Sequence, residues 1–312
     1  MLFLTRASIT PDKGGRELSD IATNAAETSA QDIYSPLADF WKRFKKNKLA
    51  VASLAFLLIL VAVALLAPFI APYDPYDGNM PMALKSPGAE HLLGTDELGR
   101  DILSRIIYGA RISLRVGVIA VSIALFSGML LGSMAGYYGG RIDNLIMRFM
   151  DIMLAFPSLL LAIAFMMVLG KGIENAIIAI AIVSVPEYAR IVRGSVLSVK
   201  ENEYVQAART IGCHDGQIIF RHILPNVMAP LIVRSTLGIS AAILETAALG
   251  FLGLGVQPPY AEWGTMLGSG RGYLFNAPHL VTFPGIAITL TVMAFNLLGD
   301  GLRDALDPRL RR

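Results

Sequence analysis

The chain has 312 residues, of which 54% are hydrophobic and only 16% are charged, with a formal net charge of +3. Soluble domains carry about 25% charged residues, so this composition excludes a disordered chain and argues against a soluble enzyme. The single cysteine, Cys213, excludes an intrachain disulfide, and the four histidines are too scattered for metal-ligand spacing. We therefore expect a membrane protein without a disulfide framework or a zinc site.

The N-terminal part of the chain divides into a polar tail and an apolar segment. Residues 1–41 lack apolar periodicity, so we predict a mobile cytoplasmic tail. Residues 49–71 carry no charge, and at about 1.5 Å per residue they are long enough to cross a ~30 Å bilayer core with some tilt. A signal peptide is the competing interpretation, but the length of the segment and its 48-residue leader favour an uncleaved anchor.

Five further segments are candidates for spanning helices. Four of them contain at most two ionisable residues each, and they cover residues 116–136, 152–169, 228–254 and 281–299. The fifth, 173–189, is weaker because Glu174 lies near one end and Pro186 and Glu187 near the other. We include it because an even number of spans places both termini on one side. The sequence thus predicts an all-α membrane protein with six transmembrane helices over residues 42–312.

Basic residues near the segment ends predict the orientation, because cytoplasmic loops retain Lys and Arg. With six spans, the side that holds both termini has 16 such residues and the opposite side has seven. Both termini are therefore predicted to be cytoplasmic. Five of the seven residues on the opposite side lie in one long loop, 72–115.

No catalytic motif is present in the sequence. Neither HExxH nor GxSxG occurs, and the run Gly170-Lys171-Gly172 is too short for a phosphate loop of the form GxxxxGK[ST]. We therefore predict that the chain is not an enzyme, does not hydrolyse ATP itself, and binds no cofactor directly.

The polar segment 190–226 is too short for a domain and too structured for a linker. Residues 198–211 are compatible with a helix that ends at Gly212, since glycine accepts the left-handed conformation of a helix terminus. A second amphipathic stretch, 216–224, is predicted to stop at Pro225. Two short helices joined at a glycine form a compact knob, and an ordinary interhelical loop is the alternative interpretation.

This segment carries a recognisable pattern, because residues 204–212 read YVQAARTIG and residues 221–226 read RHILPN. It resembles the cytoplasmic loop of ABC-importer permeases, whose pattern is EAA, three residues, Gly, nine residues, I, one residue, LP. Gln206 replaces the first Glu and His222 replaces the Ile. The matching positions are Ala207, Ala208, Gly212, Leu224 and Pro225.

The resemblance extends from about residue 42 to the end of the chain. Four further motifs are similar to the second permease subunit of dipeptide and oligopeptide importers: LGTDELGRD at 93–101, FLGLG at 251–255, EWGTML at 262–267 and NLLGDGLRDALDP at 296–308. The resemblance implies a type I ABC importer permease bundle, with a MetI-like fold, in a bacterial inner membrane.

The resemblance also implies partners and a role for the knob. The expected partners are the lipid bilayer, a homologous second permease subunit, two cytoplasmic ATPase subunits that hold ATP and Mg, and an extracytoplasmic peptide-binding protein, but no nucleic acid. The residues expected to couple the chain to the ATPase are Glu203, Tyr204, Gln206, Ala207, Ala208, Gly212, Leu224 and Pro225. The alternatives are a permease for nickel chelates or glutathione, an ion-coupled secondary carrier, and a purely structural membrane anchor.

Glu245 is the ionisable residue placed deepest in a predicted span. Facing lipid, it would cost about 2.5–3.5 kcal/mol. Arg234 lies 11 residues earlier, on nearly the same helix face but about 16 Å away along the axis, so the two cannot pair directly. Glu245 therefore requires a partner from another helix or subunit, and it is either a pathway residue or a packing residue.

Other residues within or beside the spans are predicted to be structural. A ladder of small residues permits close helix approach in lipid, and it consists of Gly128, Gly132, Gly136 and Gly140. Pro157 and Pro284 are expected to bend their helices. Asp151 is expected to pair with Arg148 on the same helix.

Two segments outside the membrane, 94–105 and 258–274, are candidates for contact with the binding protein. The second contains an amphipathic set suited to lying along the membrane interface: Trp263, Met266, Leu267 and Leu274. Interfacial anchoring and partner recognition are both open for this segment.

Overall fold

The computed structural model describes residues 36–306, and side chains from residue 39 onward. Within this range it contains helices and one isolated bridge, between Thr95 and Asp101, but no strand, which confirms the all-α class. The chain divides into two units, 1–43 and 44–312, and α2 (Pro36–Phe44) falls almost entirely in the first. Most of the predicted tail, 1–41, lies outside the described residues.

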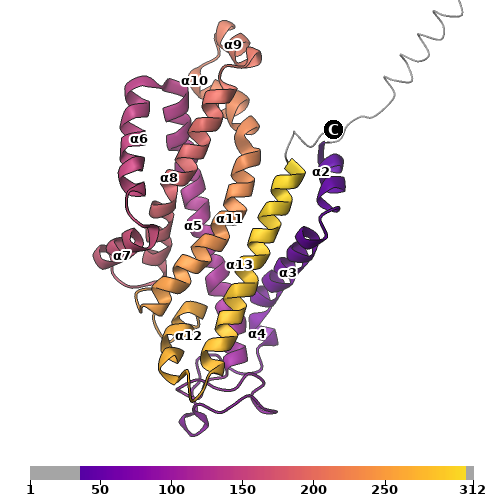
Figure 1. Ribbon diagram of the computed structural model, residues 1–312, viewed down its shortest axis with the longest axis vertical. Coiled ribbons are helices and arrows are strands. Elements are labelled where there is room, and N and C mark those ends of the chain that lie inside the picture. Colours follow the sequence, from indigo (N-terminus) through magenta and orange to yellow (C-terminus); the bar gives the residue numbers. More distant parts are fainter. Residues whose placement is uncertain (1–35, 307–312) are drawn as a thin grey trace, which may run out of the picture. The chain divides into compact units, whose positions relative to one another are not determined.

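Five helices of the second unit are long and apolar enough to cross a membrane (Figure 1). They are α3 (Lys48–Leu65), α5 (Ile102–Tyr138), α8 (Ile173–Val199), the helical run Asp215–Phe251 that ends in α11 (Leu224–Phe251), and α13 (His279–Leu306). The weak segment 173–189 is therefore part of a long helix. Glu174 lies in its first turn, where the helix dipole favours a carboxylate, and Pro186 is accommodated inside the helix.

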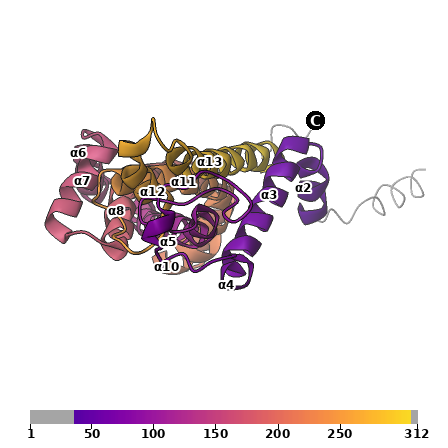
Figure 2. The same cartoon turned by 90° about the horizontal axis from the view of Figure 1, so that it is seen from below.

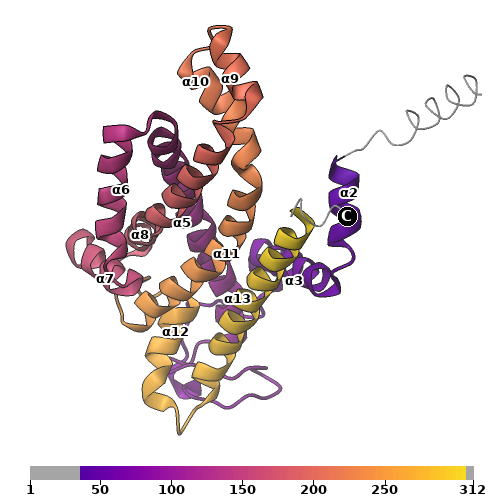
Figure 3. The ribbon, with the colours of Figure 1, turned by 45° about the horizontal axis from the view of Figure 1, so that its top comes forward.

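The predicted span over 152–169 is not one straight helix. Its residues belong to α6 (Gly140–Leu154) and α7 (Ser158–Leu169), which meet at 95° (Figure 3). Pro157 between them is extended, with φ −56° and ψ 131°, and it has no amide hydrogen with which to continue the helix. Six spans are reached only if this bent pair crosses as one.

Two short helices lie at the end of the bundle opposite α9 (Glu203–Thr210). They are α4 (Ala67–Ile70), which follows α3, and α12 (Trp263–Gly270), which lies between α11 and α13. Figure 2 looks onto this end, which also holds the loop 71–101 and is called the α12 end below.

The centre of the bundle is the contact between α5 and α8. A Cβ atom on Gly128 would lie 2.4 Å from the Tyr188 Cβ, one on Gly132 2.4 Å from the Ala189 carbonyl oxygen, and one on Gly136 2.9 Å from the Val196 Cβ. The predicted ladder is thus confirmed for three glycines, which let the two backbones touch. Gly140 is not part of it, because it begins α6 with open space around it.

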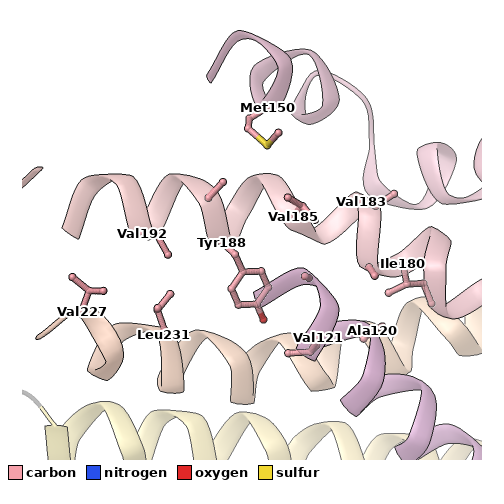
Figure 4. Packing of buried hydrophobic residues seen from close by; sticks show 14 of the residues in the cluster. Ala120, Val121, Met150, Ile180, Val183, Val185, Tyr188, Val192, Val227 and Leu231 are labelled. Carbon is pink, nitrogen blue, oxygen red and sulfur yellow. The ribbon is translucent and has the colours of Figure 1, made fainter. Parts of the chain in front are cut away.

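Tyr188 fills the space where α5, α8 and α11 converge. Figure 4 shows its ring pointing from α8 towards Val121 of α5 and the helix that carries Leu231. Tyr188, Ala189 and Leu231 are fully buried. Because the ring lies directly beside the glycine ladder, its position depends on the absence of side chains there.

We predict that Gly132→Ala lowers the free energy of unfolding by about 1–3 kcal/mol, because the added methyl group meets backbone that cannot move aside. Gly194→Ala is the control, since Gly194 lies inside α8, the helix against which Gly132 of α5 packs, yet has nothing within 4 Å of its missing Cβ. Thermal unfolding of the purified protein in detergent measures both variants. Equal melting temperatures for the two would contradict the close approach of α5 and α8.

Candidate coupling site

The predicted knob exists, but its first helix is shorter than expected. The prediction of one helix over 198–211 is wrong, because Val199 is the last residue of α8, and α9 begins only at Glu203. Asn202 between them adopts the extended conformation of an N-cap residue, with φ −69° and ψ 146°. α9 thus follows α8 directly through a three-residue turn.

The end of α9 confirms the prediction for Gly212. Its φ is +85°, the Gly212 amide donates to the Arg209 carbonyl oxygen at 3.1 Å, and the Cys213 amide donates to that of Ala208 at 3.1 Å. These two bonds form a Schellman motif, which satisfies the last carbonyls of the helix. Nothing lies within 4 Å of the missing Cβ, so this position requires glycine for its backbone conformation and not for space.

The second predicted stretch does not stop at Pro225. α10 (Asp215–Gln217) leads into a π-helical turn over 218–223, which continues without a break into α11. In a regular helix the Pro225 ring would clash with the carbonyl group of Arg221. The wider π-turn directly before the proline accommodates it. The knob is therefore joined rigidly to α11.

The predicted coupling residues separate into an exposed and a buried set. The exposed set consists of Glu203, Tyr204, Gln206, Ala207, Gly212 and Pro225. Ala208 and Leu224 are buried, and Ala208 belongs with Val205 and Ile219 to the apolar cluster beneath α9. In the described part of the chain, only the exposed set is accessible to a partner protein. Ala208 and Leu224 instead fix the position of the knob.

Three contacts fasten the knob to the end of α5. The Tyr137 hydroxyl donates to Asp215 Oδ1 at 2.7 Å, and the Arg209 guanidinium lies 5.5 Å from the centre of the Tyr137 ring. The Lys200 ammonium donates to the Gly136 carbonyl oxygen at 3.0 Å, one of the last carbonyls of α5. The interaction with Tyr137 raises the pKa of Arg209. α9 and α10 are thus held by α5 as well as by their own neighbours in sequence.

Ion pairs join α8 to α6 near the same end. Arg193 donates to both carboxylate oxygens of Asp143, at 2.5 and 2.6 Å, and Arg190 donates to Asp151 at 2.6 Å. The expected pair between Asp151 and Arg148 is therefore wrong. Asp151 pairs with a residue of the neighbouring helix α8. Residue spacing within α6 predicts only partners on α6 itself, so it could not predict this pair.

The deep ionisable residues also find partners on other helices. Arg234 of α11 forms an ion pair with Glu187 of α8 and lies 5.7 Å from the centre of the Tyr188 ring. The carboxyl group of Glu245 interacts with the Ser158 hydroxyl, which α7 presents after its bend. The expectation that Glu245 uses another helix is confirmed. Its role as a pathway or a packing residue stays a prediction.

For the segment 258–274, where interfacial anchoring and partner recognition are both open, the structure buries two of the four residues of the amphipathic set. Trp263 is only 1% exposed, and its indole nitrogen donates to the Ile106 carbonyl oxygen at 3.0 Å. Met266 is also buried. α12 therefore packs inside the bundle, because its Gly264 lets it touch the α11 backbone at Ala247.

A buried carboxylate fixes the start of α12. Glu262 accepts hydrogen bonds from the amides of Gly264 and Thr265, at 2.9 and 2.8 Å, and from the Thr265 hydroxyl at 3.1 Å. Burial raises the pKa of Glu262, while these bonds act in the opposite direction. This side chain is an N-cap, and in the part of the chain that the structure describes, no group of three potential ligands could hold a metal ion.

Comparison with known proteins assigns the chain to a family. The family model "Binding-protein-dependent transport system inner membrane component" matches residues 128–312, and "N-terminal TM domain of oligopeptide transport permease C" matches residues 35–87. The chain belongs to the family of binding-protein-dependent inner-membrane transport components. The resemblance to ABC-importer permeases is thus confirmed, and the chain is a multi-pass inner-membrane permease.

Curated relatives and solved structures agree with this assignment. The dipeptide transport permease DppC of Alkalihalophilus pseudofirmus is 53% identical over 89% of this chain and 91% of its own length. The di/tripeptide transport permease DppC of Pseudomonas aeruginosa is 52% identical over 92% of this chain and 97% of its own length. The glutathione transport permease GsiD of Pectobacterium atrosepticum is 46% identical over 90% of this chain and 94% of its own length. The MetNI methionine ABC transporter shares the fold, with a TM-score of 0.53 at 18% identity over 65% of this chain and 96% of its own.

We predict that Tyr137→Phe speeds amide hydrogen exchange in residues 203–217, because it removes the hydrogen bond to Asp215 that fastens the knob. Tyr138→Phe is the matched control, since Tyr138 is the next residue and lies exposed on the surface. Exchange followed by mass spectrometry reads out both variants. Unchanged exchange in Tyr137→Phe would show that the knob does not depend on this contact.

Proposed function

We propose that the chain is one of two permease subunits of an ATP-driven importer of di- and oligopeptides. The observation that carries this proposal is the knob, which places the exposed residues of the EAA-like pattern on α9 and fastens them to α5, α8 and α11. Two relatives that are 52–53% identical are named as permeases for dipeptides and for di/tripeptides, which supports peptides as the substrate.

In this proposal the knob and both termini are cytoplasmic. Two ATPase subunits bind ATP and Mg, and a groove of one ATPase receives the exposed face of α9, with Glu203, Tyr204, Gln206 and Ala207. The chain itself contributes no catalytic group. A peptide-binding protein on the other side of the membrane delivers the substrate at the α12 end.

Force applied to α9 reaches three long helices at once. α8 enters α9 through a three-residue turn, α11 continues from α10 without a break, and α5 is held through Tyr137 and Gly136. Closure of the ATPase pair on ATP therefore tilts α5, α8 and α11 as a body. Such a two-state movement opens the path between the paired permeases alternately to each side.

The alternatives differ in how well they fit these observations. Membership in a binding-protein-dependent family argues against an ion-coupled carrier and against a passive anchor. Glutathione is the second candidate substrate, because glutathione permeases are 46–49% identical to the chain. Uptake of labelled dipeptide and of labelled glutathione into proteoliposomes that contain the full transporter separates the two. Uptake that continues with a catalytically inactive ATPase would exclude the ATP-driven mechanism.

We predict that Gly212→Val leaves the protein in the membrane and abolishes at least 90% of peptide uptake, about a tenfold loss or more. A β-branched residue resists the φ of +85° at this position, so the Schellman motif is lost, yet there is no clash to prevent folding. Uptake in cells at matched abundance is the measurement.

Gly216→Val is the matched control, because Gly216 lies in the adjoining helix with a negative φ and open space around it. It is expected to retain most of the uptake. Normal uptake by Gly212→Val at normal abundance would count against the coupling role of the knob.

A further inference from the structure

A cavity of about 740 Å³ opens at the α12 end, between α3, α5 and the first turn of α8. Its wall is mainly apolar, but six polar or aromatic side chains line it: Tyr76, Tyr108, Arg111, Arg115, Glu174 and Tyr260. The volume lies within the range of about 300–1,000 Å³ that is typical of small-ligand sites. None of the coupling residues reaches this cavity, so it is a separate feature of the chain.

A buried arginine holds two of the tyrosines in place. Arg105 donates to the Pro75 carbonyl oxygen at 2.8 Å and to that of Pro259 at 3.5 Å, directly before Tyr76 and Tyr260. Its guanidinium lies 3.4 Å from Asp96, and Asp96 also accepts from Arg100 at 2.7 Å. The loop 71–101 and the segment before α12 are therefore fixed to each other at the cavity wall.

The three tyrosines converge from distant parts of the sequence. The Tyr76 ring lies edge-on to both Tyr108 and Tyr260, with ring centres 6.1 and 6.2 Å apart. Partial burial raises the pKa of Tyr76 above its ordinary value. This arrangement offers aromatic surface together with hydroxyl groups, which suits a ligand with both apolar and polar parts.

Three charged residues line the cavity without forming an ion pair. Arg111 and Arg115 of α5 and Glu174 of α8 take part in no ion pair among residues 39–306. The Arg111 guanidinium lies 6.0 Å from the centre of the Tyr108 ring. The core of a subunit interface is depleted in charged residues, so this wall is better suited to a small charged ligand than to a second permease.

We propose that this cavity is a binding site for the imported peptide itself within the permease. Arg111 and Arg115 bind the C-terminal carboxylate, Glu174 binds the N-terminal ammonium, and the three tyrosines contact the peptide side chains. Arginine matches a carboxylate with two parallel hydrogen bonds, which explains why both cations are guanidinium groups. This inference rests on the proposed function, because it concerns the substrate of the same importer.

Protection of a single cysteine tests occupancy directly. Cys213→Ser removes the only native thiol, and Val118→Cys then places one in the cavity wall. In the assembled permease and ATPase complex in nanodiscs, millimolar dialanine is expected to slow alkylation of this thiol at least threefold, whereas the dialanine amide is not. Ser86→Cys in the same background is the control, because Ser86 is exposed at the same end outside the cavity. A thiol at position 118 that is unreactive, or equally reactive with and without dialanine, overturns the proposal.

Transport by charge variants tests the assigned roles. The double variant Arg111→Gln and Arg115→Gln is expected to raise the dialanine concentration for half-maximal uptake at least about tenfold, since the loss of even one charged hydrogen bond weakens binding by about that factor. Lys171→Gln is the matched control, because Lys171 is exposed near Glu174 but does not line the cavity. Wild-type uptake by the double variant overturns the cavity site alone, whereas a wild-type transporter that imports no peptide overturns the proposed function. Loss of the second permease from the purified double variant assigns the arginines to assembly and also overturns the site.

Discussion

The direct contact of α5 with α8 is the constraint on which the rest of the bundle depends. In a bilayer, lipid tails are as apolar as leucine, so helices associate through close packing and not through the hydrophobic effect. Gly128, Gly132 and Gly136 supply this packing, because each missing side chain is replaced by backbone or side chain of α8. The same contact aligns the end of α5 with the start of the knob, where Lys200 and Asp215 reach it. A shift of α5 along α8 would therefore break the attachment of the knob.

Some charged side chains form ion pairs between elements of the bundle, and others line the cavity without an ion-pair partner. Near the knob, Arg193 and Arg190 tie α8 to α6, and at the α12 end Arg105 of α5 is paired with Asp96 of the loop 71–101. Each of these pairs joins two different elements of the fold. Arg111, Arg115 and Glu174, by contrast, face a cavity without forming an ion pair within the described part of the chain. Their place in the cavity wall, together with the absence of an ion pair, is what makes these three charges candidates for ligand binding.

This distribution gives the two ends of the bundle different physical properties. The knob is short, capped by Gly212 and attached to α5 at three points. The α12 end has a helix buried by its Trp263, a loop fixed by ion pairs, and a cavity between them. In the proposed function these properties correspond to a force received at one end and a substrate received at the other.

The sequence by itself determined the features that depend on local chemistry. Long apolar runs predicted the spanning helices, Gly212 predicted a positive φ at the end of α9, and the spacing around Gln206 and Leu224 predicted the family. These inferences succeed because backbone hydrogen bonding in lipid and steric limits on φ act within a few residues.

Only the tertiary structure decided what depends on a neighbouring segment. An apolar run has the same sequence whether it faces lipid or protein, so hydropathy did not reveal the burial of Trp263. Pro157 predicted a bend, but its angle of 95° came only from the structure. The partner of Asp151, the contact of Glu245 with Ser158 and the convergence of the three tyrosines each join residues far apart in the chain. No local pattern encodes such contacts, because they arise only when the helices pack.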